Sequence, residues 1–201
     1  PDELDGRPNW VIGIASLAIL SALSGNPIGA VAWGCALILV GGALFLASVQ
    51  NTWLNRVMLI GAFSISALPF SLTASAWLGN LNFFIPFAII AQALMMAGFI
   101  RHALRSTNRD SLDNQPGWMQ AVYPSGIILL ILTQLLLGFI GWDGALQVGA
   151  WLQAIIASFL TFGLVWASRR FRIFNPVRAH WVSSTESRLN NFYQGLWSIY
   201  R

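Results

Sequence analysis

The sequence contains very little charge, and its 201 residues include no lysine. Charged residues make up 9% of the chain, whereas a typical soluble domain has roughly 25%. Between Trp10 and Ser168, the charged residues and histidines lie between the long apolar runs or at their edges. They are Arg56, Arg101, His102, Arg105, Arg109, Asp110, Asp113 and Asp143. This composition excludes an ordinary soluble domain and indicates a polytopic membrane protein.

Residues that carry chemistry are also scarce. The single cysteine, Cys35, lies inside an apolar run, which excludes a disulfide framework. No cluster of His, Cys, Asp and Glu has the spacing of metal ligands, and no glycine-rich phosphate loop occurs. Asp110 and Asp113 lie among arginines in a polar loop, where acid–base catalysis is not expected. We therefore predict no catalytic residue, no metal and no cofactor for the chain itself.

What the sequence does contain is a series of apolar runs. About 20 apolar residues in a helix cross roughly 30 Å of hydrocarbon. Six runs qualify, the first of them marginally, at 10–24, 28–49, 54–79, 81–100, 119–141 and 145–168. Gly25-Asn26-Pro27 is a strong turn signal between the first two runs. The predicted fold class is all-α, a bundle of about six transmembrane helices at 10–168.

The arginines predict the orientation of this bundle. When the loops are placed on alternating sides, all eleven arginines fall on one side, which the positive-inside rule makes cytoplasmic. Membrane topology thereby explains the net charge of +4, and no nucleic-acid partner is expected. We expect both termini in the cytoplasm, with residues 1–9 as a polar N-terminus. Residues 1–9 lack the apolar region of a signal peptide, so we expect a processed chain or the remaining part of a longer ancestor.

The basic tail at 169–201 is predicted to contain an amphipathic helix at 183–200. Ser183 and Glu186 have the spacing of a capping box, and the aromatic and aliphatic residues after them recur at helical spacing. We expect this helix on the cytoplasmic membrane surface or against a protein partner.

Three further patterns concern the packing of the bundle. Tryptophans near the ends of the runs predict an aromatic belt at the level of the headgroups, and they are Trp10, Trp53, Trp77, Trp118, Trp142 and Trp166. Small residues in the first two runs predict close helix packing, and they are Gly13, Gly29, Gly34, Gly41 and Gly42. Polar side chains inside later runs predict hydrogen bonds between helices, and they are Gln92, Thr133, Gln134 and Gln153.

The third run differs from the others because it contains a proline among hydroxyl residues. Pro69 lies among Ser64, Ser66, Ser71, Thr73 and Ser75. Proline removes a backbone donor, and in lipid the freed carbonyls need other partners. The run 54–79 is therefore either a discontinuous helix of the kind that builds ion paths, or a proline kink patched by Ser and Thr. The candidate residues of the broken helix are Pro69, Ser66, Ser71, Thr73 and Ser75.

The order of these features resembles a known family. An arginine-bearing loop is followed by an apolar half-helix, Ser66-Ala67-Leu68-Pro69, a Ser/Thr-rich half-helix, a span ending in arginine, and Pro116-Gly117-Trp118-Met119. Between Arg56 and Asp143 the chain resembles the C-terminal part of the antiporter-like membrane subunits of respiratory complex I and of Mrp-type antiporters. The resemblance implies a subunit of a hetero-oligomeric NADH-quinone oxidoreductase-type complex in the bacterial cytoplasmic membrane, or in an equivalent energy-converting membrane.

The chain also departs from that family. The family carries a lysine or glutamate for proton transfer in the half-helix after the Leu-Pro pair, and the matching position here is Leu78. Because leucine cannot titrate, we expect a degenerate subunit that does not pump protons and has a structural or assembly role. One alternative is half of a split proton or cation transporter whose other half carries the charges. Another is an unrelated six-span protein associated with lipid or pigment.

Overall fold

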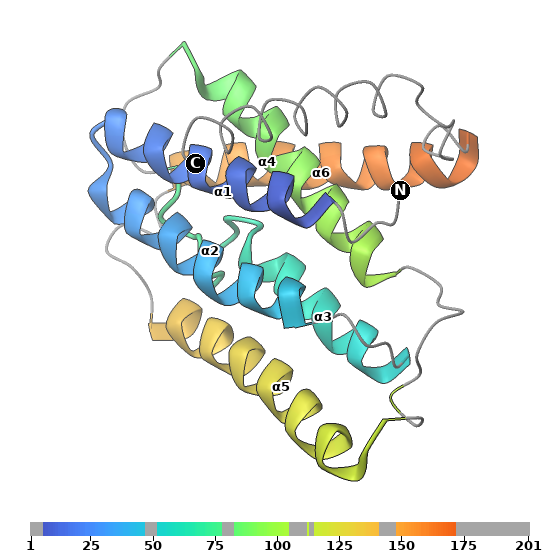
Figure 1. Cartoon of the computed structure of the whole chain (residues 1–201). Helices are drawn as coiled ribbons and strands as arrows, with labels where there is room; N and C mark the ends of the chain where they lie inside the picture. Colours follow the sequence, from blue (N-terminus) through green and yellow to red (C-terminus); the bar gives the residue numbers. More distant parts are fainter. Residues whose placement is uncertain are drawn as a thin grey trace, which may run out of the picture. The chain divides into compact units, whose positions relative to one another are not determined.

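The computed structural model describes residues 6–46, 52–77, 83–104, 112, 115–140 and 148–171. Most of them form helices, and no strand occurs among them (Figure 1). The helices are α1 (Arg7–Leu23), α2 (Pro27–Leu46), α3 (Thr52–Ser64), α4 (Ile85–Ala103), α5 (Gly117–Ile140) and α6 (Val148–Phe171). The predicted all-α class is confirmed for this part of the chain. The tail helix predicted at 183–200 lies outside the described residues.

The chain divides into two compact units. Residues 2–166 hold α1 to α5 and most of α6. In the second unit, residues 167–201 with Pro1, the described part is the end of α6 at 167–171.

Four helices have the length and apolar composition to cross a membrane. They are Pro27–Leu46, Ile85–Ala103, Gly117–Ile140 and the Trp151–Arg170 part of α6. The apolar helix α1 has 17 residues, and α3 has 13, which at 1.5 Å per residue gives α3 a length of only about 20 Å. Among the described residues, four helices are therefore long enough to span a membrane, and the predicted count of six spans is not confirmed. The run 54–79 falls short because its helix ends at Ser64.

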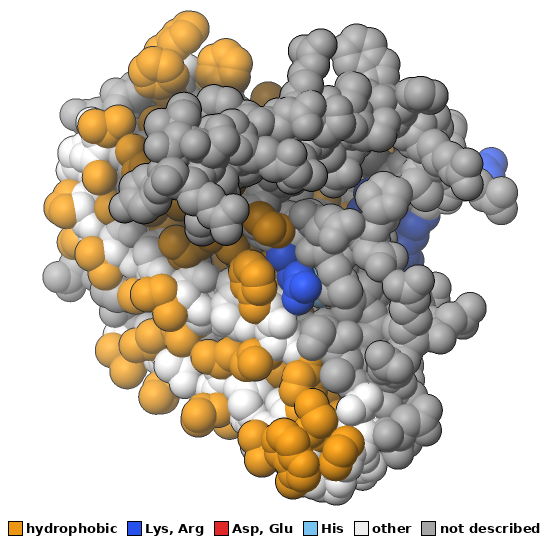
Figure 2. All heavy atoms as spheres, in the orientation of Figure 1, with side chains coloured by type: hydrophobic (Ala, Val, Ile, Leu, Met, Phe, Trp, Pro, Cys, Tyr) orange, Lys and Arg blue, Asp and Glu red, His pale blue; other side chains and the backbone are white. Residues whose placement is uncertain are grey.

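The outward faces of these helices are apolar. Leu129, Leu132 and Leu136 of α5 are exposed, as are Phe159 and Phe162 of α6. Figure 2 shows hydrophobic side chains over much of the visible surface of the described part. An outer surface with so many exposed hydrophobic side chains is unfavourable in water and is normal against lipid or another membrane protein. Exposure and helix length together indicate an integral membrane protein.

The turn between α1 and α2 follows directly from Gly25-Asn26-Pro27. Gly25 has a left-handed backbone with φ 75°, and its N–H bonds the Ala22 carbonyl at 3.1 Å while the Asn26 N–H bonds Ser21 at 3.0 Å. This pair of backbone hydrogen bonds is typical of a helix that ends at a glycine. Asn26 then caps α2, since its Oδ1 accepts from the Gly29 N–H at 2.8 Å. The turn sets α1 and α2 antiparallel (Figure 1).

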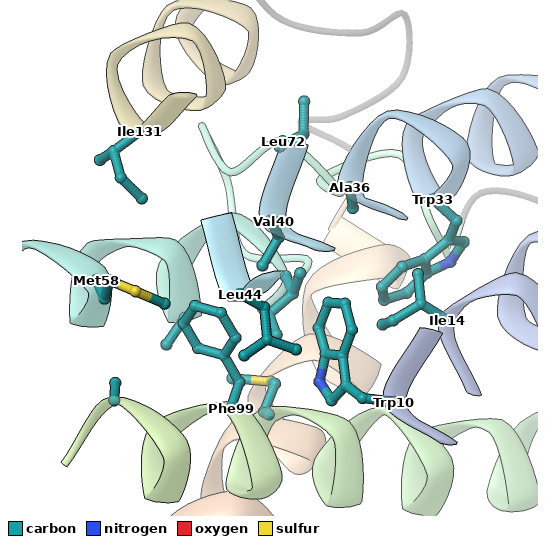
Figure 3. Packing of buried hydrophobic residues seen from close by; sticks show 14 of the residues in the cluster. Trp10, Ile14, Trp33, Ala36, Val40, Leu44, Met58, Leu72, Phe99 and Ile131 are labelled. Carbon is teal, nitrogen blue, oxygen red and sulfur yellow. The ribbon is translucent and has the colours of Figure 1, made fainter. Parts of the chain in front are cut away.

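The core of the larger unit lies between α1, α2, α3 and α4, with α5 packed against α2 and α3. Figure 3 shows Trp10, Leu44 and Phe99 meeting there, with Met58 and Val40 beside them. The glycines predicted to allow close packing differ in their surroundings. A Cβ at Gly13 would collide with the Met95 side chain and one at Gly41 would touch Trp10, whereas nothing lies within 4 Å of the corresponding point at Gly34.

Trp10 does not belong to an aromatic belt. It is only 6% exposed, its indole N–H donates to the Met95 carbonyl at 2.9 Å, and its ring centroid lies 6.0 Å from that of Phe99. The prediction for Trp10 was wrong because α1 turns this residue toward α4. Trp53, Trp118 and Trp166 are exposed, as a headgroup anchor requires.

We expect Trp10→Phe to lower the free energy of unfolding by about 1–2 kcal/mol, since it removes a hydrogen bond and part of a buried ring. The matched control is Trp118→Phe, at a tryptophan that is 67% exposed. Thermal unfolding in detergent would compare the two variants, and equal effects would contradict the buried role of Trp10.

Candidate functional site

The candidate site is the non-helical segment at 65–77 that follows α3, called the break below. Its residues form turns where the sequence is still apolar. Ala67 and Phe70 have left-handed backbones with φ 57° and 64°. Such a conformation costs about 1–2 kcal/mol for a residue other than glycine. Pro69 between them cannot donate a backbone hydrogen bond and disfavours a helical Leu68. The surrounding contacts must therefore hold the break in this conformation.

Hydroxyl side chains within the break replace the helical hydrogen bonds lost at Ser64. The backbone N–H of Thr73 donates to the Ser64 carbonyl at 3.1 Å, and the Thr73 hydroxyl donates to the same carbonyl at 3.0 Å. The hydroxyl oxygen also accepts from the Ala67 N–H at 3.0 Å. Thr73 thus folds the break back onto the end of α3.

Ser66 has a similar role one turn away. Its hydroxyl donates to the Phe63 carbonyl at 2.7 Å and accepts from the Leu68 N–H at 3.2 Å. These bonds satisfy backbone groups that lipid cannot satisfy.

Gln92 of α4 joins both ends of the break. Its Nε2 donates to the Ile65 carbonyl at 3.0 Å, and its Oε1 accepts from the Trp77 indole N–H at 3.0 Å. The side chain is almost fully buried. Gln92 was predicted to bond another helix, and its partners in the structure instead lie in the non-helical break.

Asn26 holds the end of the break from the other side. Its Nδ2 donates to the carbonyls of Ser75 at 2.9 Å and Ala76 at 3.2 Å. Sequence reasoning assigned Asn26 to a turn only. The helix-capping preference of asparagine was the available signal, but nothing local pointed to a partner 49 residues away.

The backbone of α5 approaches the break closely at Gly138. A Cβ there would collide with the Phe70 carbonyl oxygen and lie 3.0 Å from the Ser71 carbonyl carbon and 3.1 Å from the Leu72 nitrogen. Only glycine fits this contact. Gly138 was also missed by sequence reasoning, because a glycine in a helical run does not reveal what it faces.

The structure places the predicted site residues on different elements. Ser66, Ser71, Thr73 and Ser75 are buried in the break, and Pro69 is half-buried there. Gln134 is buried on α5 and Gln153 on α6. Leu78 lies outside the described residues.

Several buried polar atoms have no hydrogen-bond partner among the described residues. They are the hydroxyls of Ser64, Ser71 and Ser75 and both amide atoms of Gln134. Native proteins leave few such atoms, so each calls for an explanation.

The side chains gathered at the break are neutral. Hydroxyl, amide and indole groups donate and accept hydrogen bonds, but they do not exchange protons near neutral pH. Among the described residues, His102 at the end of α4 is the only buried histidine or charged side chain. The break can position helices or hold small polar ligands, and its own residues supply no titrating group.

No protein-family model matches this chain, nor does any curated protein or solved structure. The resemblance to antiporter-like subunits therefore rests on the motif at 66–69 and the order of features around it.

We expect Gln92→Leu to destabilise the fold, because it leaves the Ile65 carbonyl and the Trp77 indole unpaired at about 1–3 kcal/mol each. Ser125→Ala is the control, since that exposed hydroxyl bonds only the Val122 carbonyl of its own helix. Chemical unfolding in mixed micelles would measure both variants. An effect of Gln92→Leu no larger than that of the control would exclude the bridging role.

We expect Gly138→Ala to lower the thermal unfolding midpoint, because the new methyl group meets the backbone of the break. Gly163→Ala in α6 has open space and should gain up to about 1 kcal/mol of helix propensity. The test is whether Gly138→Ala lowers the thermal unfolding midpoint while Gly163→Ala raises it. A stabilising Gly138→Ala would show that α5 does not contact the break this closely.

Proposed function

We propose that the chain is a non-pumping, antiporter-like membrane subunit with a structural or assembly role in a membrane energy-converting complex. The observation that carries the proposal is what the polar side chains in and around the break bond to. Thr73, Ser66, Gln92 and Asn26 all bond the chain's own backbone. A segment built in this way supports the arrangement of α2, α3 and α4, which is what an assembly subunit requires.

The distribution of charge supports the same proposal. Between Trp10 and Ile100, Arg56 is the only charged residue in the sequence. Proton transfer through a membrane depends on ionisable side chains inside the bundle. The matching family position is Leu78, and the glutamine and hydroxyl groups near the break do not titrate in the useful range.

Partner subunits and lipid would cover the outer faces of the bundle. The exposed leucines of α5 and phenylalanines of α6 are apolar surfaces of the kind that adjacent membrane subunits bury. The arginines at the predicted cytoplasmic ends support a location in a bacterial cytoplasmic or equivalent membrane, with both termini inside.

The test is native purification of a tagged chain from its host in mild detergent, followed by mass spectrometry of what migrates with it. We expect quinone-reductase, hydrogenase or Mrp-type subunits. Pro69→Ala should then reduce the assembled fraction, because it removes the constraint that ends the helix, while proton pumping per assembled complex stays unchanged.

Pro124→Ala, at the proline inside α5, controls for general effects of removing a proline. Loss of pumping from a fully assembled Pro69→Ala complex would contradict the non-pumping role. Migration of the chain alone would contradict membership of a complex.

A second candidate is half of a split proton or cation transporter. The buried polar atoms of Ser64, Ser71, Ser75 and Gln134, which have no hydrogen-bond partner among the described residues, favour it, since a neutral polar route needs such groups. Transport by this chain reconstituted with a charge-bearing neighbour, and by neither chain alone, would establish it.

A further inference from the structure

The break lies at one end of the helices that hold it. Asn26, which bonds the carbonyls of Ser75 and Ala76, directly precedes the first residue of α2. Gly138, which lies against the Phe70 carbonyl, is two residues before the end of α5. Because an α-helix rises 1.5 Å per residue, each contact lies within about one turn of a helix end. The second half of the break is therefore level with the start of α2 and the end of α5.

Helix length places this end at the boundary of the hydrocarbon. α2 has 20 residues and is therefore about 30 Å long, which matches the thickness of the hydrocarbon core. α5 has 24 residues and, at about 36 Å, reaches the headgroups. When α2 spans the hydrocarbon, Asn26 and the carbonyls that it bonds lie where the acyl chains meet the headgroups.

In the described part of the larger unit, the charged side chains lie at the opposite end. Arg7 begins α1 and donates to the Phe45 carbonyl near the end of α2 at 3.2 Å. Arg56 lies near the start of α3, whose end leads into the break. α4 meets the break at Gln92 and continues to Arg101 in its last turn. Arginine-bearing ends face the cytoplasm under the positive-inside rule, so the break lies at the non-cytoplasmic end.

The tip of the break is both non-helical and exposed. Leu68 and Pro69 are half-buried, and Phe70 is 51% exposed. Irregular backbone that faces lipid does not occur within the hydrocarbon core, because no water is there to bond its polar groups. The exposed tip therefore agrees with the helix ends in placing this part of the break at the membrane surface.

Exposed phenylalanine rings gather at the same end. Phe70 stacks on Phe139 of α5, with ring centroids 5.8 Å apart. Where α4 begins, Phe83 contacts Phe84 and Phe87, with ring centroids 5.8 and 6.2 Å apart. All five side chains are exposed. Such rings are unfavourable in water, and membrane-surface helices bury phenylalanine at the boundary of headgroups and acyl chains.

We propose that the break is a cap at the non-cytoplasmic surface of the membrane and does not lie at the midplane. Lipid is its partner there. The rings of Phe70 and Phe139 enter the boundary between headgroups and acyl chains, while buried residues of the break contact α4 and α5. This inference stands on helix ends, exposure and charge, and it does not depend on the proposed function.

The depth of spin labels in the membrane tests the proposal. Single cysteines are introduced into the full chain after Cys35→Ala, which removes the single native cysteine, and the labelled protein is reconstituted in lipid vesicles. Power-saturation EPR compares collisions with oxygen, which concentrates in hydrocarbon, and with a nickel chelate, which stays in water. We expect a several-fold higher nickel-to-oxygen ratio at Phe70→Cys than at Leu132→Cys, an exposed position on α5 about 10 Å from Phe139 along the helix.

Two further positions keep the test decisive if Phe70→Cys does not fold. Phe139→Cys and Phe84→Cys replace exposed rings at the same expected depth. Ratios at these positions no higher than at Leu132→Cys would overturn the proposal, because the break would then lie near the midplane.

A membrane-impermeant maleimide added to intact spheroplasts that express the chain identifies the side. It should modify Phe70→Cys from outside, and Trp53→Cys at the start of α3 only after permeabilisation. The reverse pattern would overturn the non-cytoplasmic placement.

Discussion

The constraint on which this structure depends is that a backbone interrupted inside an apolar bundle must find all its hydrogen bonds within the protein. The break follows α3 inside a run that the sequence predicts to cross the membrane, and much of it is buried in the protein. Thr73 of the break satisfies the Ser64 carbonyl at the end of α3. Gln92 of α4 satisfies the Ile65 carbonyl, and Asn26 satisfies the Ser75 carbonyl at the far end of the break. The two left-handed residues, Ala67 and Phe70, persist because these bonds fix the chain on both sides of them.

That constraint also determines how the neighbouring helices are arranged. Gln92 and Asn26 belong to α4 and to the cap of α2, so satisfying the break sets the position of both helices against α3. The core around Trp10, Leu44 and Phe99 then fills the space between them. On the α5 side the contact is made by a glycine, because at Gly138 backbone lies against backbone. The hydrogen bonds of the break thus help to set the positions of the helices that pack around it.

The same features support the functional proposal. Neutral hydroxyl and amide side chains satisfy backbone groups at the break without any charge, which supports the proposed structural role. The buried hydroxyls of Ser64 and Ser71 and the Gln134 amide have no hydrogen-bond partner among the described residues, which a simple kink patched within one helix would not explain.

The sequence by itself determined the class of the protein and the place of its interruption. Scarce charge and long apolar runs required membrane helices, and Pro69 among serines and threonines marked a segment where a regular helix would lose its bonds. Only the tertiary structure decided that α3 ends at Ser64, that Trp10 faces the core, and that Asn26 and Gly138 belong to the site. Proline and hydroxyl side chains affect the backbone within a few residues of themselves, so their effects can be predicted from a short stretch of sequence. The partners of Asn26, Gln92 and Gly138 are set by helices brought together from distant parts of the chain, and no local pattern encodes those distances.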